Sequence, residues 1–175
     1  MQDRGNRLAH GDASAFAELY DACADRLHHY LTMRLGSRDA ASDVLQEVFL
    51  RLVRTRKRLH RVDNPAAYAF AIARNESTRW LSRRRRYATE ITLDAAELFL
   101  VDKSQSFASR ERAEAVTDAM NHLDERDREI IELKVYGGLT FREVSHVTKT
   151  SEATVATRYR RAVQRMHRRL VRELR

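Results

Sequence analysis

The residues best suited to bind a ligand lie between positions 151 and 170, where hydroxyl and guanidinium side chains repeat at helical spacing. At about 100° per residue, an apolar stripe and a polar stripe fall on roughly opposite sides of one helix. The apolar stripe consists of Val155, Tyr159, Ala162, Val163, Met166 and Leu170, and the polar stripe of Thr154, Thr157, Arg158, Arg161, Arg165 and Arg168. Arginine can donate two hydrogen bonds to a guanine edge, and hydroxyl groups can bond bases or phosphates. The pattern favours a helix that enters the major groove of DNA; the alternative is a solvated basic helix on a small bundle.

The segment before this helix carries the capping and turn signals of a helix-turn-helix. Thr140 followed by Glu143 is the capping-box pattern, which satisfies free N–H groups at a helix start. Residues 147–150 can turn the chain, and Ser151 is a good N-cap for the helix that follows. We therefore expect a helix-turn-helix over residues 139–166.

A second group of basic and aromatic residues lies in the first half of the chain. A basic run over residues 54–61 leads into Asn64 and Pro65, a natural N-cap and first helical residue. The helix that follows contains Tyr68 and Trp80 and ends in four consecutive arginines, 83–86. Such residues can be ordinary core plus solvated surface. They can also form a platform on which unpaired bases stack while cations hold the backbone.

No arrangement of residues indicates catalysis, a metal site or a cofactor. The seven histidines have no usable metal-ligand spacing with Cys23, the single cysteine. No glycine-rich phosphate loop is present, and the acidic run 124–129 is typical of a solvated helix start. We expect a protein that is not an enzyme and has no cofactor.

Composition indicates an all-α protein with a polyanionic partner. The 175 residues include only 5 glycines and 1 proline, too few for many turns between strands. The formal net charge of +8 favours a polyanion but does not separate DNA from RNA or an acidic membrane. No apolar run is long enough to cross a bilayer or to act as a signal segment, so we expect a cytoplasmic protein without membrane insertion.

Capping residues and apolar stripes divide the chain into two helical modules. Asp12 and Ser37 can cap two helices, the first ending at Gly36, whereas residues 1–11 are expected to be loose. The first of these helices has a stripe of Phe16, Leu19, Tyr20, Cys23, Leu27, Tyr30 and Leu31, and the second has one of Ala41, Val44, Leu45, Val48, Phe49 and Leu52. In the last module, Ala113, Val116, Met120 and Leu123 mark one helix, and Ile130, Ile131, Leu133 and Val135 mark the core side of the next. We expect domains at 12–86 and 109–172.

The segment between the modules has a different composition. The four carboxylates of residues 88–107 face a single lysine, Lys103, whereas basic residues outnumber acidic ones on both sides. Residues 87–108 are therefore expected to be a flexible acidic linker. Its apolar stretch 98–101 is unusual for a tether, so we expect part of it to dock.

Two separated stretches of the sequence resemble a sigma-70-type RNA polymerase sigma factor. The first stretch resembles region 2 of that family. It contains DVLQEVFLRL at 43–52, NPAAY at 64–68, IARN at 72–75 and the arginine cluster 83–86. The second stretch, residues 122–169, resembles region 4. The order of the two regions and the short connector between them resemble the small extracytoplasmic-function (ECF) group.

This resemblance implies a transcription initiation factor with two DNA contacts and a polymerase contact. It implies that core RNA polymerase binds through its β′ clamp helices to region 2 and through its β flap to region 4, and that an anti-sigma factor is a plausible further partner. The implied polymerase-binding residues are Asp43, Gln46, Glu47 and Arg51. Those for the single-stranded promoter −10 element are Arg61, Asn64, Tyr68, Arg74, Asn75, Arg79, Trp80, Arg83 and Arg84, and those for the duplex −35 element are Thr140, Ser151, Thr154, Thr157, Arg158, Arg161 and Arg165.

Two positions depart from the family pattern, and two other functions stay open. Lys149 stands at a turn position where the family often has glycine, and Ala156 stands where a lysine or arginine is common. The first rival function is a free-standing helix-turn-helix regulator, which needs no polymerase. The second is a recombinase or nuclease with a helix-turn-helix tail, for which no convincing nucleophile or carboxylate cluster is present.

Overall fold

The computed structural model describes residues 2–90 and 107–173, and these residues form helices separated by short turns. The chain divides into two units, one within residues 1–97 and the other within 98–175. The prediction of an all-α, two-module protein is confirmed for the described residues. The predicted acidic linker and its apolar stretch 98–101 lie outside them, apart from the helix ends on either side.

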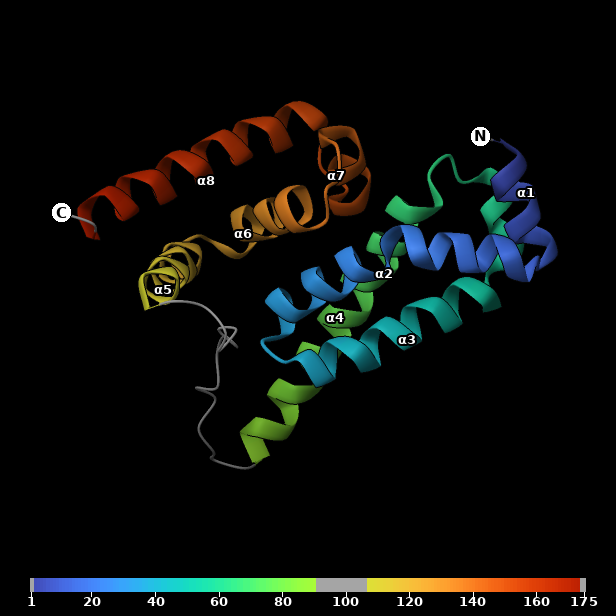
Figure 1. Ribbon diagram of the computed structural model, residues 1–175, viewed down its shortest axis with the longest axis horizontal. Helices are drawn as coiled ribbons and strands as arrows, with labels where there is room; N and C mark the ends of the chain where they lie inside the picture. The colour runs from blue at the N-terminus through green and yellow to red at the C-terminus, as the bar shows by residue number, and fades with distance from the viewer. Residues whose placement is uncertain (1, 91–106, 174–175) are drawn as a thin grey trace. The chain divides into compact units, whose positions relative to one another are not determined.

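In the first unit, three long helices pack on one another in every pairwise combination: α2 (Ala13–Leu35), α3 (Arg38–Arg54) and α4 (Pro65–Glu90) (Figure 1). Each begins where a side chain accepts hydrogen bonds from free backbone N–H groups. Asp12 caps α2, Ser37 caps α3, and the Asn64 side chain accepts from the N–H groups of Ala66 and Ala67 at 3.0 and 3.2 Å. Gly36 ends α2 in the left-handed conformation that glycine adopts without steric cost. The predicted caps are confirmed.

The core of this unit follows the predicted stripes with one clear exception. Leu19, Leu27, Tyr30, Leu31, Val48 and Leu52 are fully buried, and Tyr30 packs edge-on against Phe70 of α4. Tyr20 was expected in the core but is 49% exposed. It lies against Phe49 at a ring-centroid distance of 4.8 Å, so the two rings close the edge of the α2–α3 contact.

Residues 2–10 were expected to be loose, and this prediction was wrong. They form α1 (Gln2–His10), which packs on α2 and on the short 3₁₀ helix η1 (Arg56–Arg61) between α3 and α4. Leu8 is fully buried, and Gly5 lies so close to the η1 backbone that an added Cβ would meet the Leu59 carbonyl oxygen at 2.9 Å. A single leucine and a close backbone approach therefore anchor a polar helix.

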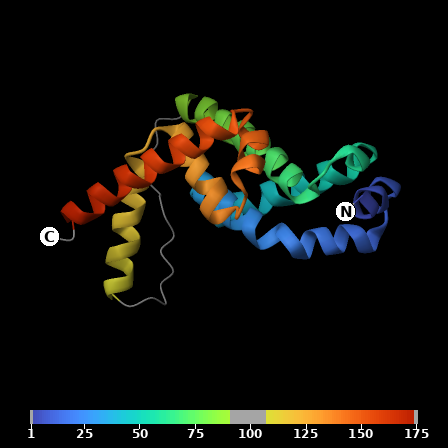
Figure 2. The same cartoon turned by 90° about the horizontal axis from the view of Figure 1, so that it is seen from above.

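The second unit contains α5 (Phe107–Asn121), α6 (Glu125–Ile131), the π-helix η2 (Glu132–Tyr136), α7 (Phe141–Thr148) and α8 (Glu152–Glu173). Helix α8 packs against α5, α6 and α7, and both Figures 1 and 2 show it as one unbroken helix with α7 beside its beginning. The core joins Met120, Leu123, Ile131 and Ala162, with Tyr136, Tyr159 and Met166 packed against it. Val135 and Val163 were expected in this core, but both are exposed.

Candidate nucleic-acid interface

The two helices of the predicted helix-turn-helix begin with the expected caps. At the start of α7, the Thr140 N–H donates to Glu143 Oε2 at 2.7 Å, and the Glu143 N–H donates to Thr140 Oγ1 at 3.3 Å. At the start of α8, the Ser151 Oγ accepts from the Thr154 N–H at 3.3 Å. Between them, Lys149 has φ 54°, the left-handed conformation that the turn requires. The predicted helix-turn-helix is confirmed as a structural element.

The beginning of α8 presents hydroxyl groups and an arginine at its surface. Ser151, Thr154 and Arg161 are exposed, and Thr157 is half-buried. The Ser151 and Thr154 hydroxyl groups lie 2.7 Å apart, so the cap also orients the first hydroxyl of the helix. Thr140, at the start of α7, is exposed as well. These groups can donate and accept hydrogen bonds with bases or phosphates.

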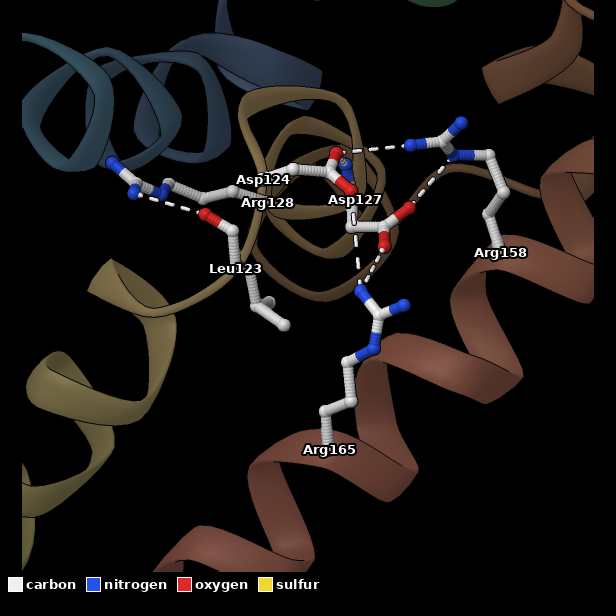
Figure 3. A network of polar contacts seen from close by, with 6 residues as sticks. All are labelled: Leu123, Asp124, Asp127, Arg128, Arg158 and Arg165. Carbon is white, nitrogen blue, oxygen red and sulfur yellow. Dashed lines mark hydrogen bonds and ion pairs between the residues drawn. The ribbon is translucent and has the colours of Figure 1, made fainter.

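Two arginines expected on the same free face turn instead toward α6 (Figure 3). The Arg158 Nε donates to Asp127 Oδ1 at 2.7 Å, and its Nη2 donates to Asp124 Oδ1 at 2.9 Å. The Arg165 Nη1 donates to the other oxygen of Asp127 at 3.1 Å. The free basic face of α8 is therefore narrower than the sequence suggested.

The interpretation of the acidic run 124–129 as a solvated helix start holds for its exposed residues 124–126 but was wrong for Asp127 and Glu129. Asp127 is 4% exposed and Glu129 is also buried. Asp124 caps α6, and the hydrogen bond from the Asp127 N–H, followed by the charge of Arg158, holds the pKa of the Asp124 carboxyl below its ordinary value. Arg128 ties this start to α5 by donating to the carbonyl oxygens of Met120, Asn121 and Leu123.

A signal for this network was present in the sequence. Arg158, Ala162, Arg165 and Arg169 are spaced i, i+4, i+7 and i+11, which places all four along one side of the helix. Ala162 is fully buried, so the arginines on either side of it lie at the edge of the core, where Arg158 and Arg169 are half-buried and Arg165 is exposed. The third of them, Arg169, donates to Asp118 of α5 at 2.7 Å.

In the first unit, α3 and α4 line a groove of about 810 Å³. Asp43 and Glu47 contribute carboxylates from α3, and Arg79, Trp80 and Arg83 contribute cations and an indole ring from α4. The Arg84 guanidinium lies 5.4 Å from the centre of the Trp80 ring, at a cation–π distance. The groove thus brings together residues that the sequence assigned to two different partners.

Glu76 joins the two helices beneath this groove and was missed in the sequence. Its carboxylate is buried and accepts hydrogen bonds from Arg51 of α3 and Arg79 of α4, the latter at 3.0 Å. Arg51, expected at an exposed interface, is therefore engaged within the unit. The sequence carried only a weak hint, an acidic residue three positions after Ala73, an interior alanine of a basic helix.

The remaining candidate residues of this unit do not line the groove. Gln46, Arg61 and Asn75 are exposed, whereas Tyr68 and Arg74 are half-buried. The side-chain oxygen of Asn64 caps α4 by accepting hydrogen bonds from backbone N–H groups. Within the described residues, no helix is long and apolar enough to cross a membrane, and no group of three metal-binding side chains is present.

Comparison with known families gives two matches in chain order. The family model described as Sigma-70 region 2 matches residues 19–87, and the one described as Sigma-70, region 4 matches residues 113–166. Among curated proteins, the ECF RNA polymerase sigma factor BldN of Streptomyces coelicolor is 29% identical over 173 residues. That match covers 96% of this chain and 65% of BldN, so the chain spans just under two thirds of that relative.

Other relatives and solved structures agree in length and fold. The ECF RNA polymerase sigma factor SigK of Mycobacterium ulcerans is 26% identical over 166 residues, which cover 90% of this chain and 87% of SigK. CnrH, solved in complex with the cytosolic domain of CnrY, has a TM-score of 0.67 at 20% identity, covering 95% of this chain and 94% of that chain. The sigma factor RpoE, solved with the anti-sigma factor NepR from Bartonella quintana, has a TM-score of 0.68 at 18% identity, covering 90% and 94%. At these identities, the likeness to the solved structures concerns the fold.

Proposed function

We propose that this chain, which belongs to the sigma-70 family, is an ECF sigma factor that recruits core RNA polymerase to promoters read at two DNA elements. In this proposal, residues 12–86 bind the polymerase and the −10 element, residues 109–172 bind the −35 element, and residues 87–108 connect them. The protein supplies binding energy and selectivity and carries out no chemical step itself.

The observation that carries the proposal is the α3–α4 groove, with carboxylates on one helix and Trp80 among arginines on the other. The outer face of α3, with Asp43 and Glu47 at the groove and the exposed Gln46 beside it, is the surface we assign to the β′ clamp helices. Polar and charged groups there suit a specific, wet interface.

The α4 side of the groove is assigned to the single-stranded −10 element. Trp80, flanked by the Arg84 guanidinium at 5.4 Å, offers a ring on which a base can stack, while Arg79 and Arg83 can neutralise phosphates. Arg61 and Asn75 are exposed and complete this assignment, whereas Asn64, Tyr68 and Arg74 shape the segment around it. Stacking and pairing of extruded bases with the protein offset the cost of unpairing them.

The −35 element is assigned to the helix-turn-helix, with α8 in the major groove. Thr154, Thr157 and Arg161 provide the base-contacting groups, and Thr140 and Ser151 at the two helix starts are suited to phosphates. The β flap is assigned to the same unit. Because the sigma factor RpoE, which has a similar fold, was solved in complex with the anti-sigma factor NepR, an anti-sigma factor is also proposed as a regulator.

Reconstituted transcription tests the proposal directly. The full chain, added to bacterial core polymerase and a genomic promoter library, is expected to yield transcripts that start at discrete promoters sharing two elements. The matched controls are core polymerase alone and a Trp80→Ala variant, which should lose most transcripts while retaining polymerase binding. Absence of promoter-specific transcripts would overturn the proposal, and tight, specific duplex binding by the chain alone would favour a free-standing regulator instead.

A further inference from the structure

The inner edge of α8 is held to the rest of its unit by three arginines. Arg158 and Arg165 meet Asp127 of α6, and Arg169 meets Asp118 of α5 with nitrogen–oxygen distances of 2.6 and 2.7 Å. These contacts involve residues 158–169, the middle and later turns of α8. Residues 152–157, which include Thr154 and Thr157, have no such ion pair among the described contacts; they pack on α7 through the fully buried Val155 and continue into the ion-paired turns that begin at Arg158.

Asp127 is the centre of this arrangement. Its side chain is 5% exposed, and each of its two oxygens accepts a hydrogen bond from a different arginine, Arg158 at 2.7 Å and Arg165 at 3.1 Å (Figure 3). A buried carboxylate with two charge-assisted partners fixes both in direction as well as distance. The two arginines lie seven residues apart, so two successive turns of α8 are held against one point of α6.

The ion pairs also limit what Arg158 can offer to DNA. Two of its three guanidinium nitrogens, Nε and Nη2, already donate to Asp127 and Asp124. Recognition of guanine by arginine uses two parallel donors directed at O6 and N7. Arg158 would have to leave a buried carboxylate to present that pair, and the loss of one of the two charge-assisted hydrogen bonds of Asp127 is costly.

We propose that Asp127 is a positioning residue for the recognition helix and that Arg158 acts through Asp127 rather than by contacting bases. Base recognition then falls to Thr154, Thr157 and Arg161. This inference rests on the proposed function, because it concerns how that function's −35 readout is divided among residues. In this proposal, Arg158 and Arg165 hold α8 in position and do not contact bases.

The test uses the full chain with core polymerase on a promoter selected by the wild-type protein and on templates with each −35 base pair changed in turn. The variants are Asp127→Asn, Arg158→Gln and the double variant, with Arg161→Gln as the matched control on the exposed side. Asp127→Asn and Arg158→Gln should each lower −35-dependent transcription about tenfold, as expected for loss of a charge-assisted hydrogen bond. The effect of the double variant should be smaller than the product of the two single effects, because both changes remove the Asp127–Arg158 contact.

The pattern over base pairs distinguishes positioning from contact. Asp127→Asn and Arg158→Gln should weaken the response to every −35 base pair evenly, whereas Arg161→Gln should erase preference at one. A changed preference at one base pair with Arg158→Gln alone, or a double variant equal to the product of the singles, would overturn the proposal. Arg158→Lys keeps the charge but not the two-donor fork, so it should behave like Arg158→Gln and not like wild type.

A measurement without DNA separates this proposal from the proposed function. Amide hydrogen exchange of the full chain should rise severalfold in the first half of α8 with Asp127→Asn and with Arg158→Gln, and not with Arg161→Gln. Unchanged exchange in both variants would refute the positioning role even if promoter-specific transcription is observed. Increased exchange with no promoter-specific transcription by wild type would leave the positioning of α8 standing and remove the promoter function.

Discussion

Lys149 occupies the turn between α7 and α8 in a backbone conformation that is strained for a residue with a side chain. It is the one non-glycine residue with positive φ among the residues that the structure describes, and it follows α7 directly. A side chain with a Cβ in this conformation costs on the order of 1 kcal/mol, which glycine avoids. The turn between the two helices is therefore formed against a local preference and depends on the packing of α7 and α8.

We predict that Lys149→Gly stabilises the second unit by up to about 1 kcal/mol, because the strain is removed while the turn stays the same. Amide hydrogen exchange of α7 and α8 in mild denaturant measures the change. Lys149→Ala is the control, since it removes the charge but retains the Cβ. Equal gains for the two variants would contradict the backbone explanation.

Two capping carboxylates make stability dependent on acid pH. The hydrogen bond from Arg7 lowers the pKa of Asp12, and the Asp127 N–H and Arg158 lower that of Asp124. A group whose pKa is lower in the folded state contributes stability above its unfolded pKa and loses it as pH falls through the folded value. We predict that the unfolding temperature falls as pH drops below about 4, where such carboxyls take up protons.

Thermal unfolding followed by circular dichroism between pH 5 and pH 3 measures this dependence. Asp12→Asn and Asp124→Asn should each flatten part of it, because the amide cannot titrate. A pH dependence that both variants leave unchanged would show that other carboxyls dominate.

At the scale of elements, α1 acts as a brace for η1, the turn that joins α3 to α4. The brace depends on the absence of a side chain at Gly5, where a Cβ would lie 2.9 Å from the Leu59 carbonyl oxygen. Lys57, Arg58, His60 and Arg61 of η1 are exposed, so the brace fixes a basic ridge whose side chains remain at the surface. That ridge ends beside the cap of α4.

We predict that Gly5→Ala loosens α1 from η1, although alanine favours a helix by roughly 0.5–1 kcal/mol over glycine. Forcing an extra carbon into a packed contact costs about 1–3 kcal/mol, so the clash outweighs the helix preference. Limited trypsin digestion measures this loosening, because η1 is rich in lysine and arginine. Cleavage in η1 should become severalfold faster. Asn6→Ala, one residue along on the exposed side, should leave cleavage unchanged or slow it.

Sequence reasoning was sound where a signal is local and failed where it depends on distant residues. The caps Asp12, Ser37, Thr140 and Ser151 could be predicted because the side chain and the N–H groups it satisfies lie within three residues. The burial of Asp127 could not be assigned locally, because its partner Arg158 lies 31 residues away. For α1, one leucine on a polar segment gives almost no periodic signal, and its stability comes from the contact with η1.

At the scale of the whole molecule, each unit has its own core, and this separation can be tested through one thiol. Cys23 is the single cysteine, and burial raises the pKa of its thiol to about 11. Its Sγ lies 3.0 Å from the Leu19 carbonyl oxygen, inside the first unit. The native thiol should therefore react with iodoacetamide at pH 8 about a hundredfold more slowly than an exposed one.

We predict that Leu52→Ala and Leu133→Ala, each truncating a fully buried side chain, destabilise different units by about 2–5 kcal/mol. Leu52→Ala should speed alkylation of Cys23 in mild denaturant, because it weakens the unit that contains the thiol. Leu133→Ala should leave the alkylation rate unchanged while lowering the stability of α6 and α8. Equal acceleration by both variants would show that the two units unfold together.

The Asp127 contact with Arg158 and Arg165 also bears on how such a protein can diverge. If the residues that hold the recognition helix differ from the residues that face the bases, a gene copy can acquire new preferences by changing Thr154, Thr157 or Arg161 alone. None of these three changes would disturb the anchoring carboxylate, so the variant would keep its fold while its set of target genes shifted. Duplicated copies could thus become independent regulators in few mutational steps.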